Sequence, residues 1–196
     1  MALAAVLWFI MFVIKPFNFW LMMGFSTSVL SVISYIHYKD QFKKEYFNLT
    51  EIAIGIGSAA LLYFIFLFGR FVLDSIGIIP NHAQNISSVY ANKEQLPEWA
   101  VAMLLFFPIG FGEEYFWRGY IQRHLGEKYG KWKALAITVA FYTAVHIPTM
   151  YPILLLASFL VGIYWGLMFL WRGNIVAAAI SHMLWDPFIF VIFPMN

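Results

Sequence analysis

Long apolar segments leave this chain few ways to fold. The sequence of 196 residues is 62% hydrophobic and only 11% charged, whereas an ordinary soluble domain is about 25% charged. An apolar helix of about 20 residues is long enough to cross a bilayer, and in lipid every backbone polar group must find a partner within the chain. The sequence therefore predicts an all-α fold, a polytopic bundle of about six to seven transmembrane helices in a multi-pass integral membrane protein.

Seven hydrophobic segments can be drawn along the chain. They cover approximately residues 2–14, 17–37, 51–73, 98–122, 132–148, 152–171 and 174–193. The first is short for a membrane span, so six and seven crossings both fit the pattern. We expect one membrane domain over residues 1–196, with residues 74–97 as its only long polar loop. Four tryptophans near segment ends fit interfacial anchoring; these are Trp99, Trp132, Trp165 and Trp171.

Lysine and arginine are divided unevenly between the two sides of this bundle. Every second link between the segments lies on the same side, and these links contain eight of the cations: Lys39, Lys43, Lys44, Arg123, Lys128, Lys131, Lys133 and Arg172. The opposite side has Lys15 and Lys93. Because short cytoplasmic loops are enriched in these cations, we expect the first group to be cytoplasmic and the loop 74–97 to be external.

Composition also excludes several classes of site. The chain has no cysteine, so disulfides, thiolate metal sites and thiol nucleophiles are excluded. Its net charge of +2 is small, and no basic stripe is interleaved with polar residues, so no nucleic acid partner is expected. The expected surroundings are the lipid bilayer.

Ionisable residues nevertheless lie inside three of the apolar segments. At bilayer depth each costs roughly 2.5–3.5 kcal/mol on insertion scales, so such residues indicate a functional site. The three groups are Glu113, Glu114 and Arg118; Tyr142 and His146; and His182 and Asp186. Residues four apart share a helix face, so His182 and Asp186 can point into the same cavity.

Helix geometry distinguishes the two glutamates. Successive residues differ by about 100° around the axis, which puts Glu114 about 40° from Arg118 and Glu113 about 140° from it. Arg118 can therefore neutralise Glu114 but leaves Glu113 without a local counterion. We interpret Glu113 as the candidate general base and Glu114 as a structural residue.

Together these side chains can activate water. A carboxylate and an imidazole, Glu113 and His146, could hold and deprotonate it. His182 and Asp186 could then face the developing oxyanion. The same residue types are also metal ligands, and a zinc site is chemically reasonable. The sequence leaves metal-free and metal-assisted water attack both open.

A purely structural interpretation treats each group separately. Glu114 and Arg118 would be a buried ion pair, His146 a packing residue bonded to a backbone carbonyl, and His182 and Asp186 a helix-stabilising pair. The joint presence of all three groups in one chain argues against it. The patterns His-Glu-x-x-His, Gly-x-Ser-Gly and Gly-x-Gly-Asp are missing, which disfavours site-2-type, rhomboid-type and aspartyl intramembrane proteases.

The three groups resemble the motifs of the CPBP family, which contains type II CAAX prenyl proteases and bacteriocin-processing (Abi) membrane enzymes. The first motif, Glu-Glu-x-x-x-Arg, is matched by residues 113–118. The second, Phe-x-x-x-His, is matched by His146 with Tyr142 in place of the usual phenylalanine. The third, His-x-x-x-Asn or Asp, is matched by His182 and Asp186. The resemblance covers about residues 98–193, which would be the catalytic core.

The resemblance implies an intramembrane endopeptidase that cleaves membrane-anchored peptides or proteins. The short chain, without a large soluble module, suggests a prokaryotic cell membrane as its location. By carry-over, Glu113 and His146 would activate water, and His182 and Asp186 would form the oxyanion side. The supporting residues would be Glu114, Arg118 and Tyr142. An ionised Asp186 cannot donate to an oxyanion, so it would be protonated, orient His182 or bind a metal.

Two other classes of function remain open. The polar cavity could serve a non-proteolytic immunity or scaffold protein, or a small proton-coupled transporter with Glu113 as the proton carrier. Transporters often show paired repeats with broken helices, and no internal repeat is apparent here. A binding protein would tolerate Glu113→Gln better than a hydrolase would.

Overall fold

Every regular element in the described part of the chain is helical. The computed structural model describes residues 1–77 and 82–195, without the side chains of residues 41, 42, 82 and 83. The α-helices are α1 (Ala2–Phe9), α2 (Phe19–Tyr38), α3 (Leu49–Ile76), α4 (His82–Tyr90), α5 (Glu98–Leu104), α6 (Phe111–Glu114), α7 (Arg123–Tyr129), α8 (Lys131–Ala144), α9 (Pro152–Arg172) and α10 (Val176–Pro187). The 3-10 turns are η2 (Lys39–Phe42), η3 (Lys44–Tyr46), η4 (Ala91–Gln95) and η7 (Ile147–Thr149). The π-helical turns are η1 (Ile10–Ile14), η5 (Leu105–Gly110), η6 (Tyr115–Gln122) and η8 (Phe188–Ile192).

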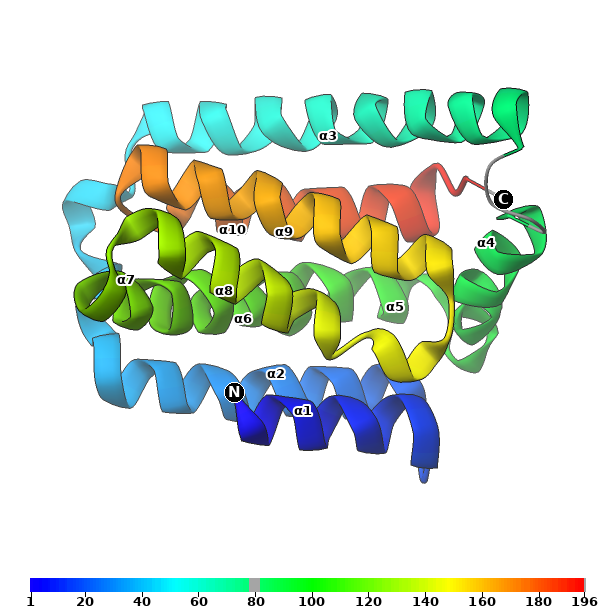
Figure 1. Ribbon diagram of the computed structural model, residues 1–196, viewed down its shortest axis with the longest axis horizontal. Coiled ribbons are helices and arrows are strands. Elements are labelled where there is room, and N and C mark those ends of the chain that lie inside the picture. Colours follow the sequence, from blue (N-terminus) through cyan, green and yellow to red (C-terminus); the bar gives the residue numbers. More distant parts are fainter. Residues whose placement is uncertain (78–81, 196) are drawn as a thin grey trace.

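The long helices lie side by side along the long axis of the molecule (Figure 1). The consecutive elements α6, η6 and α7 form one rod, packed between α2 and α8, while α3 packs along α10 and α8 packs along α9. α4 crosses one end of this bundle. The predicted all-helical fold is confirmed for the described residues.

Three helices are individually long and apolar enough to cross a membrane. In the described residues these are α2, α3 and α9, with a fourth span if α4–η4 and the segment Glu98–Tyr129, bent by 102° against each other, are counted as one. The apolar helices Ala2–Ile14 and Val176–Ile192 are shorter. The helix lengths thus support a multi-pass membrane protein with three to four candidate spans. They do not show the six to seven spans predicted from the sequence.

Local sequence explains where the long helices begin and end. The side chain of Asn18 accepts hydrogen bonds from the first amides of α2, and Asn48 does the same for α3. These caps satisfy amides that have no partner within the helix. α3 and α9 end at Gly77 and Gly173, whose φ values of 67° and 69° fall in the left-handed region that glycine adopts without strain.

Two predicted boundaries differ from the structure. The fourth apolar segment is interrupted, because Phe107 is extended (φ −154°, ψ 127°) before Pro108, which lacks an amide proton for helical bonding. The expectation that residues 74–97 form a polar loop is wrong for the described part. α3 continues to Ile76, and α4 and η4 follow, while residues 78–81 lie outside the described residues. Tertiary contacts stabilise this segment, since Tyr90 Oη donates to the Ile189 carbonyl oxygen at 2.6 Å.

Two glycines let neighbouring helices approach the rod beside the glutamates. A Cβ atom at Gly110 would lie 3.0 Å from the backbone of Met183 in α10. A Cβ atom at Gly112 would lie 2.8 Å from Ser31 Oγ in α2. The absent side chains therefore allow α2 and α10 to pack directly against the part of the rod that carries Glu113 and Glu114.

Candidate active site

One cavity of about 340 Å³ brings the predicted catalytic residues together. Its lining includes Glu113, His146, His182 and Asp186, together with Tyr142. Glu113 lies in α6 and Tyr142 in α8, while His146 follows the end of α8. His182 and Asp186 lie in α10. All five side chains are buried. The fold thus gathers three sequence motifs that are separated by more than a helix length along the chain.

Glu114 and Arg118 form the ion pair expected from their spacing. Arg118 Nη1 donates to Glu114 Oε1 at 2.7 Å, and both residues are fully buried. Arg118 Nη2 donates to the carbonyl oxygen of Gly162 at 3.0 Å. The guanidinium also lies 5.0 Å from the centroid of the Tyr142 ring. Arg118 therefore links the rod to α9 and α8 as well as neutralising Glu114.

His182 lies between two carboxylates. Its Nδ1 is 2.9 Å from Glu114 Oε1, and its Nε2 is 3.2 Å from Asp186 Oδ2. A carboxylate only accepts hydrogen bonds, so Nδ1 is the donor to Glu114. Glu114 is therefore more than the counterion of Arg118, because the same carboxylate oxygen also fixes the orientation of His182.

Glu113 faces a different set of partners. Its Oε2 accepts a hydrogen bond from Tyr142 Oη at 2.9 Å, and the residue is 3% exposed. No cationic Lys or Arg partner is found for Glu113 within the described residues, as the helical geometry predicted. The hydroxyl that distinguishes Tyr142 from a phenylalanine is thus the group that holds Glu113.

His146 lies just beyond the end of α8. Its Nδ1 lies 2.8 Å from the carbonyl oxygen of Tyr142. A carbonyl oxygen cannot donate, so this nitrogen carries the proton, and the second nitrogen of a neutral ring keeps a lone pair. The carbonyl bond was expected for a packing histidine, but His146 also lines the cavity.

Trp165 is the site residue that sequence reasoning missed. It was expected at a membrane interface, but it is fully buried, and its indole stacks on His182 with ring centroids 3.8 Å apart. The other three tryptophans predicted as anchors are exposed. Gly162 and Gly166 could have indicated that Trp165 is buried. Trp165 lies within about 100° of both around α9, and both glycines face the protein interior.

The remaining histidines with described side chains lie away from the cavity. His37 stacks on Tyr120 at 4.8 Å, and His124 Nδ1 is 3.3 Å from Tyr38 Oη. The side chain of His82 lies outside the described residues. Neither His37 nor His124 lines the cavity.

The His, Asp and Glu side chains of the cavity are the candidate ligands for a zinc ion. Within residues 1–77 and 82–195, no group of three His, Asp or Glu side chains is arranged to hold a metal ion. Both nitrogens of His182 already face carboxylates. The arrangement does not fit the tetrahedral zinc site that the residue types allowed.

Comparison with known proteins identifies the part of the chain that carries this site. Residues 95–188 match the family described as Type II CAAX prenyl endopeptidase Rce1-like. No curated protein and no solved structure matches the chain. The matched residues contain all three motifs and every residue predicted for the site. Residues 95–188 therefore form a domain of the Rce1-like type II CAAX prenyl endopeptidase family.

Proposed function

We propose that this protein is an intramembrane endopeptidase that hydrolyses membrane-associated peptides or proteins by water attack. Family membership implies a protease with protein substrates. The observation that carries the mechanism is the position of Glu113. Its buried carboxylate has no counterion among the contacts described and shares one cavity with His146, His182 and Asp186. This is the arrangement that a general base for water requires.

The first step generates the nucleophile. Glu113 takes a proton from a water molecule, while the unprotonated nitrogen of His146 accepts the second hydrogen bond of that water. The water oxygen attacks the carbonyl carbon of the substrate, and the carbonyl π electrons move to its oxygen. Tyr142 Oη supports this step, since its hydrogen bond at 2.9 Å holds the carboxylate of Glu113 in place.

The second step needs a donor for the oxyanion. His182 Nε2–H, which faces Asp186 Oδ2 in the structure, supplies it by sharing its hydrogen bond between Asp186 and the carbonyl oxygen of the bound substrate, while Glu114 and Trp165 hold the imidazole ring. Preorganised donors of this kind stabilise charge that develops in the transition state. Asp186 orients His182 from 3.2 Å, one of the three roles that the sequence left open. The amide C–N bond then breaks, and Glu113 returns its proton to the leaving amine. No step passes through a metal.

We further propose that the chain crosses the bilayer seven times. The shorter elements α1–η1, α8 and α10–η8 would each span about 20–26 Å at 1.5 Å per residue. The hydrocarbon core is about 30 Å thick, and short helices are accommodated by local thinning. All three run along the same axis as α2 and α3 (Figure 1), which supports the proposal.

The test compares wild type with Glu113→Gln at matched membrane levels. Profiles of membrane peptides and protein termini are recorded from cells that carry each form. We expect termini that are present with wild type and absent with Glu113→Gln. The exposed acid Glu45 provides a matched control, and Glu45→Gln should leave the profile unchanged. Normal turnover by Glu113→Gln would contradict the assignment of the base.

The same comparison separates the other classes of function. An immunity or scaffold protein would bind its partner with Glu113→Gln in place and would produce no dependent termini. A proton-coupled transporter would show uptake that follows the proton gradient and that Glu113→Gln abolishes. Identical terminus profiles with the substrate present would therefore favour one of these two classes.

A further inference from the structure

The catalytic cavity extends toward only one end of the helical bundle. Besides the buried site, its lining includes Lys15 after η1, Asn92 in η4, Thr149 and Tyr151 between α8 and α9, and Met195 near the C-terminus. The end of η1, the α8–α9 link and the C-terminus lie at the end of the bundle that α4 crosses (Figure 1). No lining residue comes from the links α2–α3, α7–α8 or α9–α10 at the other end.

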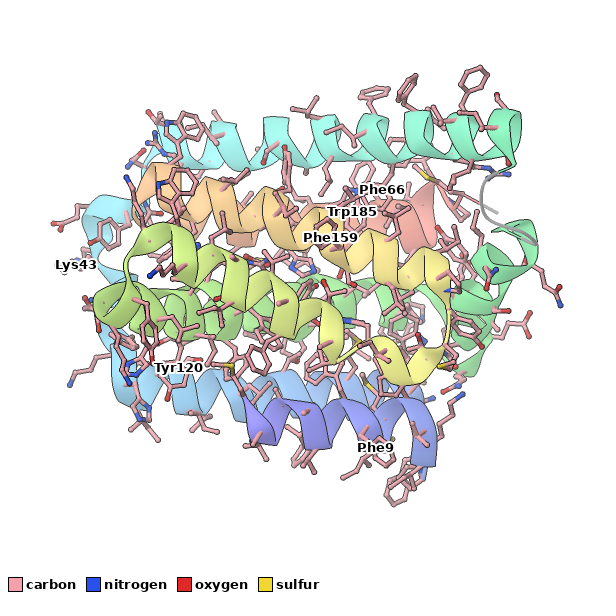
Figure 2. The ribbon with its side chains drawn as sticks, viewed as in Figure 1. Phe9, Lys43, Phe66, Tyr120, Phe159 and Trp185 are labelled. Carbon is pink, nitrogen blue, oxygen red and sulfur yellow. The ribbon has the colours of Figure 1, made fainter. Side chains whose placement is uncertain are left out.

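The opposite end carries the cations. The links there and the helix ends beside them contain the eight lysines and arginines that predict the cytoplasmic side, and Lys43 marks this end in Figure 2. Since Lys and Arg are enriched in short cytoplasmic loops, the cavity extends into the half of the membrane that faces away from the cytoplasm.

The cavity also reaches the lipid-facing surface at the side of the bundle. Near the cationic end α3 and α9 are held together, because Arg172 Nη2 lies 2.6 Å from Glu51 Oε1 and Tyr164 Oη donates to the Ser58 carbonyl oxygen. Farther along, the same two helices supply cavity-lining residues that are 39–41% exposed. These are Ile65 of α3 and Leu156 and Leu160 of α9. We infer an opening between them and name it the α3–α9 slot; Gly69 and Arg70 of α3 also line the cavity.

The end of the cavity is covered by α4 and η4. Trp20 Nε1 donates to the Asn92 carbonyl oxygen at 2.8 Å, and Tyr90 Oη donates to the Ile189 carbonyl oxygen at 2.6 Å. These bonds tie the crossing segment to α2 and to η8. On the far wall, Phe66 packs against Trp185 with ring centroids 4.8 Å apart (Figure 2). The slot, whose rims are apolar, is therefore suited to a ligand that arrives from lipid.

We propose that substrates reach Glu113 sideways through the α3–α9 slot, from the non-cytoplasmic half of the bilayer. The substrate class is then a membrane-embedded peptide segment whose scissile bond lies in that half. The identification of the occupant as a substrate rests on the proposed protease function. The position of the slot and its side of the membrane rest on the geometry and the charge distribution.

Because the chain has no cysteine, single introduced cysteines can test which end of the bundle faces away from the cytoplasm. Glu94 in η4 and Glu45 in η3 are both exposed acids at opposite ends of the bundle, and replacing either leaves the Lys and Arg counts unchanged. In intact bacterial cells a membrane-impermeant maleimide should label Glu94→Cys about tenfold more than Glu45→Cys. Both should be labelled after detergent solubilisation. Labelling of Glu45→Cys alone in intact cells would overturn the assigned side.

The slot is tested with a lipid-soluble probe. Ala157→Cys places one thiol on the cavity wall, and pyrenylmaleimide is added to the protein in phosphatidylcholine vesicles. Gly69→Trp should slow this labelling about tenfold by filling the slot. Gly57→Trp is the matched control, because a Cβ atom meets nothing within 4 Å at either glycine and Gly57 does not line the cavity.

Both tryptophan variants are compared at equal folded yield by gel filtration. If Gly69→Trp folds poorly, Gly69→Leu replaces it. Equal labelling rates in the Gly69 and Gly57 variants would overturn the slot as the route. Neither labelling experiment depends on cleavage, so a failure to find Glu113-dependent termini would reject the protease function while leaving the result for the slot intact.

Discussion

The indole ring of Trp165 lies face to face with the imidazole of His182, with ring centroids 3.8 Å apart and planes 17° from parallel. Trp165 Nε1 also donates to Ser181 Oγ at 3.1 Å, which fixes the indole on α10. Glu114 and Asp186 each contact one nitrogen of His182, but these two contacts leave the ring free to rotate about the line that joins them. Stacking removes that freedom, so Trp165 is a positioning residue for the proposed oxyanion donor.

Replacing Trp165 should therefore lower turnover more than substrate binding. We expect Trp165→Leu to reduce kcat about tenfold with little change in KM, since an aromatic pair is worth roughly 0.5–1.5 kcal/mol. Trp165→Phe keeps a ring and should recover most of kcat. The measurement is the cleavage rate of a Glu113-dependent substrate over a concentration series.

Trp171 on the same helix supplies the control for this prediction, because it is 66% exposed. Trp171→Leu should retain the wild-type rate. A change in KM without a change in kcat for Trp165→Leu would contradict the positioning role. So would a kcat for Trp165→Phe as low as that of Trp165→Leu.

Arg118 should be essential for the folded state. Arg118→Ala leaves Glu114 buried without its guanidinium partner, and breaking a buried pair in this way costs about 3–5 kcal/mol. We expect a lower folded yield and a lower free energy of unfolding in detergent. Arg70→Ala is the control, because its i,i+4 contact with Asp74 at 3.7 Å is half-exposed. Equal stability of the two variants would contradict the importance of the buried pair.

The contact between the rod and α2 at Gly112 leaves no room for a side chain. A Cβ atom there would lie 2.8 Å from Ser31 Oγ and 3.0 Å from Thr27 Cβ. Gly112→Ala should lower the free energy of unfolding by roughly 1–3 kcal/mol, the usual cost of overpacking. Gly57→Ala has open space and should not be destabilising, since alanine favours helix over glycine. Unfolding curves of both variants in the same detergent decide the point.

A pH-dependent contribution to stability is expected at the cationic end. Arg123 donates to both carboxylate oxygens of Asp40, at 2.8 and 2.9 Å. These hydrogen bonds hold the pKa of Asp40 below its usual value. A carboxyl group whose pKa is lower in the folded state stabilises the fold above its ordinary pKa, near 4, and loses that contribution as the pH falls through the lowered value.

Asp40→Asn should consequently melt slightly below wild type near pH 7, and the gap should close at pH values below about 4. The effect is small, because Asp40 is on the surface and surface ion pairs contribute little. Thermal unfolding in detergent across this range is the measurement. A gap that stays constant with pH would assign the difference to packing instead of charge.

Local patterns in the sequence were enough to predict much of the fold and of the candidate site. Apolar segments fixed the all-helical membrane fold, since lipid leaves backbone groups no other partner. The spacing of Glu114 and Arg118 predicted their ion pair, because residues four apart share a face on any helix. The three motifs indicated the family that the match over residues 95–188 supports. The catalytic roles of Glu113, His146, His182 and Asp186 stay predictions.

Tertiary structure alone decided the contacts between distant helices. Glu114 meets His182 from 68 positions away, and Tyr142 meets Glu113 from 29 positions away. Helical periodicity gives the direction of a side chain around its own axis, but it does not say which helix lies opposite. The burial of Trp165 against α10 and the hydrogen bonds that tie α4 and η4 to α2 and η8 follow from such packing. The proposed α3–α9 slot likewise depends on tertiary structure, because Ile65 and Leu160 line one cavity from two different helices.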